Sequence, residues 1–89
     1  MKRGESVQVL IHNVRTNEGD FTFTAVFCDR EDAVAQMQMW ISNCVNSVWY
    51  KSCSLSETPE VVQTEDYWRV CFIANNEYEE LMINQETIH

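Results

Sequence analysis

Residues 21–28 read Phe21-Thr22-Phe23-Thr24-Ala25-Val26-Phe27-Cys28. The three phenylalanines and Ala25 fall at every second position, and the two threonines lie between them. A period of two residues is typical of a β-strand that buries one face. The segment therefore predicts a strand whose aromatic face is covered by a second layer of structure.

The residues before this segment predict a strand that pairs with it. Val7, Val9 and Ile11 alternate with Gln8, Leu10 and His12 over Ser6 to Val14. The polar segment Arg15 to Asp20 places Gly19 where a hairpin needs a residue with positive φ. Matching the two apolar faces predicts three opposed pairs and places His12 opposite Thr22 on the other face. These pairs are Ile11–Phe23, Val9–Ala25 and Val7–Phe27.

The residues after this segment predict one long helix, from Arg30 to Cys44. Asp29 is a good N-cap, because its carboxylate can accept hydrogen bonds from the first free amides. Glu31 and Asp32 place negative charge where the helix dipole favours it. Ala33, Met37, Trp40, Ile41 and Cys44 follow helical spacing and form one apolar stripe. We expect this stripe to pack on the sheet, with Trp40 facing Phe23.

The second half of the chain is less regular. Alternation over Ser47 to Ser54 predicts a third strand, and Leu55 to Asp66 reads as an irregular loop with a short extended piece at Val61-Val62. Tyr67 to Ala74 predicts a fourth strand with Trp68, Val70, Phe72 and Ala74 on one face.

The tail after Asn75-Asn76 has two interpretations. Asn76 with Glu79 can form a capping box, and the helix formers in Glu77 to Leu81 slightly favour a short helix. The segment Tyr78 to Ile83 also suits an edge strand that follows a tight turn.

Together these elements predict a single α+β domain over residues 1–89. It is a two-layer sandwich in ββαββ order, in which one helix packs on a four- to five-stranded, mainly antiparallel sheet, with the tail as a short helix or an edge strand. The open face of this sheet is expected to be half apolar and to carry Leu10, His12, Thr22, Thr24, Val26, Trp49, Lys51, Tyr67, Arg69 and Ile73.

The charge balance excludes some classes of protein. Fourteen acidic residues against six basic ones give a net charge of −8. This argues against direct binding to nucleic acid, which rests mainly on Lys and Arg. No apolar run reaches the roughly 20 residues of a membrane-spanning helix, and the chain begins with polar residues instead of an apolar signal segment. We expect no membrane partner and a cytoplasmic location, in the host cell if the protein is phage-encoded.

Four cysteines stand 16, 9 and 18 residues apart without a Cys-x-x-Cys pair, which is poor spacing for structural zinc. In a reducing compartment they are expected to be small apolar side chains in or beside the core. They are Cys28, Cys44, Cys53 and Cys71.

We find no catalytic constellation in the sequence. His12 is the only internal histidine, and its natural partner Cys28 pairs near Ser6 in the predicted register, roughly 20 Å away at ~3.4 Å per residue. Gly4 and Gly19 stand alone, so there is no phosphate-binding loop. We therefore expect no enzyme activity, no catalytic residue, no metal site and no cofactor.

The charge is unevenly distributed. Residues 1–51 contain six acids and five bases, a net charge of −1, whereas residues 52–89 contain eight acids and Arg69, a net charge of −7. Such a concentration can attract a basic partner, or it can serve only to keep the protein soluble. The candidate partner-binding residues are closely spaced carboxylates with aromatic neighbours, together with one tryptophan on the open face. They are Glu77, Tyr78, Glu79, Glu80, Glu65, Asp66, Tyr67 and Trp49.

In size, acidity and lack of a catalytic constellation, the chain resembles the small phage-encoded inhibitors of host defence, the anti-CRISPR and anti-restriction proteins. The resemblance implies a non-catalytic inhibitor that occupies the nucleic-acid site of a basic protein. Immunity proteins and antitoxins that neutralise basic nucleases bind through the same electrostatic complementarity. The alternative is a structural or assembly module that forms a homodimer through the open sheet face, by way of Leu10, Val26, Trp49, Tyr67 and Ile73.

Overall fold

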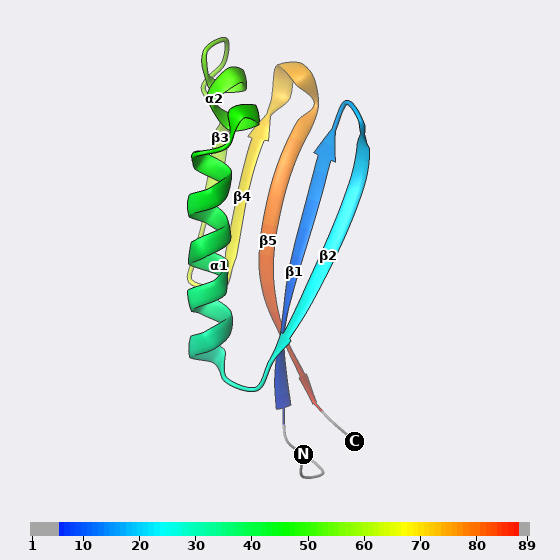
Figure 1. Ribbon diagram of the computed structural model, residues 1–89, viewed down its shortest axis with the longest axis vertical. Helices are drawn as coiled ribbons and strands as arrows, with labels where there is room; N and C mark the ends of the chain where they lie inside the picture. Colours follow the sequence, from blue (N-terminus) through cyan, green and yellow to red (C-terminus); the bar gives the residue numbers. More distant parts are fainter. Residues whose placement is uncertain (1–5, 88–89) are drawn as a thin grey trace.

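The computed structural model describes residues 6–87 and confirms an α+β architecture, with two helices on one face of a five-stranded sheet (Figure 1). The elements follow one another as β1 (Ser6–Thr16), β2 (Gly19–Phe27), α1 (Arg30–Val45), α2 (Val48–Ser54), β3 (Glu60–Gln63), β4 (Tyr67–Phe72), the 3-10 turn η1 (Ile73–Asn75) and β5 (Glu77–Thr87).

All neighbouring strands of the sheet are antiparallel, in the order β2-β1-β5-β4-β3. The tail is therefore strand β5, not a helix, and it lies at the centre of the sheet. Asn76 takes the left-handed conformation, with φ 55°, and turns the chain from η1 into β5. Pairing with β1 and β4 on both sides, and burial of Leu81 and Ile83, outweigh the local helix propensity of Glu77 to Leu81.

The register between β1 and β2 differs by one residue from the predicted one. Leu10 lies opposite Ala25, and His12 lies opposite Phe23. A shift of one residue exchanges the two faces of a strand. Because β1 carries apolar side chains on both faces, its alternation does not show which face the helices cover. Leu10 and His12 thus lie on the helix-covered face, and Leu10 is fully buried.

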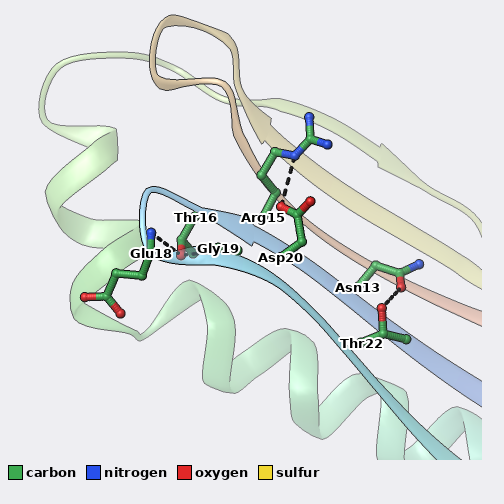
Figure 2. Close-up of polar contacts among 7 residues, drawn as sticks. All are labelled: Asn13, Arg15, Thr16, Glu18, Gly19, Asp20 and Thr22. Atoms are coloured by element: carbon green, nitrogen blue, oxygen red, sulfur yellow. Dashed lines mark hydrogen bonds and ion pairs between the residues drawn. The ribbon is translucent and has the colours of Figure 1, made fainter.

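Polar pairs on the open face hold the β1–β2 hairpin in this register (Figure 2). Thr22 donates a hydrogen bond to Asn13 across the two strands at 2.9 Å, and Arg15 lies 3.2 Å from Asp20. Gly19 has φ 137°, which confirms the predicted need for a glycine in the hairpin.

The core lies between α1 and the centre of the sheet. Its largest fully buried side chains come from β1, α1, β4 and β5; they are Phe72, Leu10, Met37, Leu81 and Val70. The predicted helix and the predicted fourth strand are confirmed, with Trp68, Val70 and Phe72 buried, while Ala74 lies exposed in η1. Asp29 is the N-cap of α1, but its side chain makes no capping hydrogen bond.

Phe23 and Trp40 do not face each other directly. Phe23 is 53% exposed, and the His12 ring lies between the two aromatic rings, with centroids 5.7 Å from Phe23 and 5.3 Å from Trp40. The predicted contact is wrong because the register places His12, not an apolar residue, on this face.

Residues 48–54 form helix α2 instead of the predicted third strand. The Ser47 hydroxyl accepts a hydrogen bond from the Tyr50 amide and donates one to the Cys44 carbonyl, so it caps the new helix directly after α1. Trp49 and Tyr50 then pack edge-on against Phe72, at centroid distances of 5.4 and 5.6 Å. The only strand between α1 and β4 is the short β3, which contains the predicted extended piece Val61-Val62.

The open face therefore carries a different set of residues from the predicted one, because the register turns Val7, Val9 and Ile11 toward it. Five of the residues expected there lie elsewhere: Leu10 and His12 on the covered face, Trp49 and Lys51 in α2, and Ile73 in η1. Thr22, Thr24, Val26, Tyr67 and Arg69 do lie on it. Within residues 6–87, no helix is long and apolar enough to span a membrane.

The cysteines are all free in the structure. Cys44 and Cys53 are buried and Cys71 is half-buried, in line with the prediction, but Cys28 is exposed where the chain leaves β2.

Candidate functional site

A recess of about 240 Å³ opens where the end of α1 meets the centre of the sheet. Strands β1 and β5 supply its floor, and α1 and the α1–α2 turn supply its wall. Its lining residues are His12, Trp40, Asn43, Cys44, Ser47 and Glu79.

An ion pair or hydrogen bond joins the two polar residues of the floor. His12 Nε2 lies 2.9 Å from Glu79 Oε2, and the two side chains are only 18% and 13% exposed. The pairing of β1 with β5 brings them together, because Glu79 lies opposite Val14, two residues from His12 on the same face of the sheet. His12 is thus a partly buried, partnered residue and does not lie on the open face as predicted.

Cys44 faces the same carboxylate from α1. Burial raises the pKa of the Cys44 thiol far above its ordinary value, and the charge of Glu79 and a hydrogen bond to it raise the pKa further. The thiol therefore stays protonated at neutral pH. Because the thiolate is the reactive form, the cluster does not supply an activated nucleophile.

The tail carboxylates named as candidate partner-binding residues all have partners within the protein. Glu77 accepts a hydrogen bond from Trp49 Nε1 at 2.9 Å, and Glu79 binds His12. On the open face, Glu80 accepts hydrogen bonds from Tyr67 at 2.5 Å and from Asn13 at 3.0 Å. These side chains are therefore half-buried and do not form one acidic surface, because alternation along β5 divides them between the two faces of the sheet.

The two tyrosines of the predicted set lie on the open face. Arg15 and Arg69 place their guanidinium groups 5.5 and 5.3 Å from the centroid of the Tyr78 ring, within cation–π range. The hydrogen bond to Glu80 raises the pKa of Tyr67, so its hydroxyl remains a donor. Trp49, the third predicted aromatic residue, lies half-buried against Phe72 and is not part of this face.

Exposed carboxylates gather instead at one corner, where the first turn of α1 meets the β3–β4 turn. We call this the acidic corner; it consists of Asp29, Glu31, Asp32, Glu65 and Asp66, all of them exposed. Arg30 connects its two halves, with Nε 3.6 Å from Glu65 and Nη2 3.7 Å from Asp66. Five acids against this one base leave the corner with a formal charge of −4.

Local structure fixes both halves of the acidic corner. Asp66 accepts a hydrogen bond from the Thr64 hydroxyl, and its carbonyl accepts one from the Ile83 amide, which ties the turn to β5. Glu31 and Asp32 are placed by the first turn of α1. The sequence predicted Glu65 and Asp66 as binding residues but assigned the other three acids only to the start of the helix. No local signal shows that these two segments, more than thirty residues apart, become neighbours.

Among residues 6–87, no three His, Cys, Asp or Glu side chains are grouped in a way that could hold a metal ion. Comparisons with protein-family models, curated proteins and solved structures find no match for this chain.

Proposed function

We propose that the protein is a non-catalytic inhibitor that binds a basic, nucleic-acid-binding protein through the acidic corner. The observation that carries this proposal is the gathering of Asp29, Glu31, Asp32, Glu65 and Asp66, from two distant segments, around Arg30. In the proposed complex, these carboxylates occupy the positions in the partner's basic groove that phosphates of a nucleic acid would otherwise take. An inhibitor of this kind is what the phage-encoded anti-defence proteins provide.

Electrostatics supports this assignment. Like charges gathered on a small domain repel one another, and a basic partner relieves that repulsion. Among residues 6–87, the cation that pairs with these carboxylates is Arg30, and it competes weakly with a partner because its ion pairs are long and exposed. The carboxylates of the acidic corner therefore stay available to a partner, in contrast to those of Glu77, Glu79 and Glu80.

The test compares two triple variants with equal net charge. The corner variant carries Glu31→Gln, Asp32→Asn and Glu65→Gln. The control variant carries Glu18→Gln, Asp20→Asn and Glu60→Gln. Each set removes three exposed carboxylates, changes the net charge from −8 to −5, and includes one acid that pairs with an arginine.

Immobilised parent protein is exposed to nucleic-acid-free lysate of the native host at low salt, and proteins that elute with salt are purified. Nucleic-acid binding by each is then titrated with the parent and the two variants. We expect the parent and the control variant to displace the nucleic acid, and the corner variant to lose at least about tenfold in potency and most of its salt dependence. Equal inhibition by both variants, or undisturbed nucleic-acid binding in the presence of the parent, would contradict the proposal.

A further inference from the structure

The outer edge of β2 is long and has no partner within residues 6–87. β2 spans nine residues at one end of the sheet and pairs only with β1, whereas the opposite edge strand, β3, has four residues. In Figure 1, β2 lies on the side of the sheet away from both helices. Exposed edge strands present unpaired amides and carbonyls that can pair with another chain.

β2 also lacks the features that usually protect such an edge. It contains no proline and no lysine, and its register with β1 runs without a bulge from Gly19 to Phe27. Its only charge, Asp20, is paired with Arg15 (Figure 2). Phe21, Phe23 and Val26 are exposed, although such side chains are normally covered.

We infer that β2 pairs with the β2 strand of a second copy of this chain, in an antiparallel ladder about a two-fold axis. Phe23 is the middle residue of β2. Pairing the whole strand with itself therefore places Phe23 opposite its own copy, Phe21 opposite Ala25, and Thr22 opposite Thr24. Aromatic and Thr–Thr pairs of this kind stabilise antiparallel sheets, and the two five-stranded sheets join into one of ten strands.

The charge distribution permits this pairing despite the net charge of −8. Asp20 lies opposite Val26 of the second copy, so no two carboxylates are paired within the nine residues of the ladder. The two Asp20 residues are six positions apart along the ladder, roughly 20 Å at ~3.4 Å per residue. This separation exceeds the Debye length of about 10 Å at 0.1 M salt. The β3–β4 half of the acidic corner, Glu65 and Asp66, lies at the opposite edge of the sheet from this ladder.

Sedimentation velocity over a range of concentrations tests the parent protein first. We expect twice the mass of one chain, with little change between 0.1 and 0.5 M salt, because apolar and main-chain contacts are not screened. A single-chain mass over the whole range would overturn the inference, and it would leave the proposed role of the acidic corner unaffected.

Variants of Val26 test the register. Val26→Asp places a carboxylate opposite Asp20 of the second copy and should weaken the dimer at least about tenfold, whereas Val26→Lys places a cation there and should preserve it. The matched control is Val61→Asp, at an equally apolar and similarly exposed position on the other edge of the sheet. Dissociation by Val61→Asp, or equal effects of the two Val26 variants, would overturn the proposed pairing.

Charge complementation at Phe23 tests the two-fold axis. Phe23→Lys and Phe23→Glu should each be monomeric, because like charges then meet at the centre of the ladder, and an equimolar mixture should form a mixed dimer. Circular dichroism checks that each variant is folded, as expected for a side chain that is half exposed. Failure of two folded variants to form the mixed dimer would exclude an axis through Phe23.

Discussion

His12 and Glu79 lie 67 positions apart in the sequence, yet their side chains meet at 2.9 Å on the floor of the recess. Both are mostly shielded from solvent, and Cys44 faces the same carboxylate. A partly buried polar cluster of this kind stabilises the fold only while its members remain paired, because an unpartnered buried group keeps its full desolvation cost.

We expect a double-mutant cycle of His12→Ala and Glu79→Ala to give a coupling free energy of about 0.5–3 kcal/mol, as is typical of residues in direct contact. Urea denaturation of the parent, the two single variants and the double variant measures it. The matched cycle combines His12→Ala with Glu18→Ala, an exposed residue of the hairpin turn, and should be additive. Additivity in the first cycle would show that the contact contributes nothing to stability.

The two helix N-caps should respond differently to truncation. Ser47→Ala removes a hydroxyl that accepts from the Tyr50 amide and donates to the Cys44 carbonyl, so it should cost about 1 kcal/mol. Asp29→Ala removes no capping hydrogen bond. It should lower the free energy of unfolding by only about 0.3 kcal/mol, because a negative charge near the positive end of the helix dipole is lost. Thermal denaturation at equal pH ranks the two, and a larger loss for Asp29→Ala would contradict the cap assignment.

Stability should fall in alkaline solution because of Cys44. Its raised pKa means that the folded state holds the thiol proton more tightly than the unfolded state. The resulting stabilisation is complete below the ordinary thiol pKa of 9.0 and decreases as the pH rises above it. The limiting slope for one such group is about 1.4 kcal/mol per pH unit. Denaturant unfolding between pH 8 and pH 11 should therefore show a steeper decline for the parent than for Cys44→Ser, which retains a donor to Glu79 and does not titrate. Parallel curves would show that Cys44 does not cause the decline.

The core position of Phe72 and the edge position of Phe23 predict unequal costs of truncation. Phe72 is fully buried between α2 and the sheet, so Phe72→Ala should cost about 3–5 kcal/mol and unfold so small a domain. Phe23→Ala should cost about 1 kcal/mol and leave the protein folded, because half of its ring is already in solvent. Circular dichroism and thermal midpoints distinguish the two, and an unfolded Phe23→Ala variant would contradict the register.

Local patterns in the sequence were enough to predict four of the secondary-structure elements. The alternation of Phe21, Phe23 and Phe27 predicted β2, and corresponding alternation predicted β1 and β4. The stripe from Ala33 to Cys44 predicted α1. These predictions succeed because periods of two and of 3.6 residues are properties of a short stretch of chain, and apolar side chains at those periods can be buried only in the matching element.

Contacts between distant segments decided the features of the fold that the sequence did not predict. The tail became a central strand because β1 and β4 pair with it, and residues 48–54 became a helix because the Ser47 cap lets Trp49 and Tyr50 reach Phe72. The pairing of β1 with β5 placed His12 beside Glu79, and the same fold brought Glu65 and Asp66 to the start of α1. Local propensity differs by about 1 kcal/mol or less per residue between ordinary side chains, so burial and pairing with distant segments outweigh it. Both candidate sites consist of residues that become neighbours only through those distant contacts.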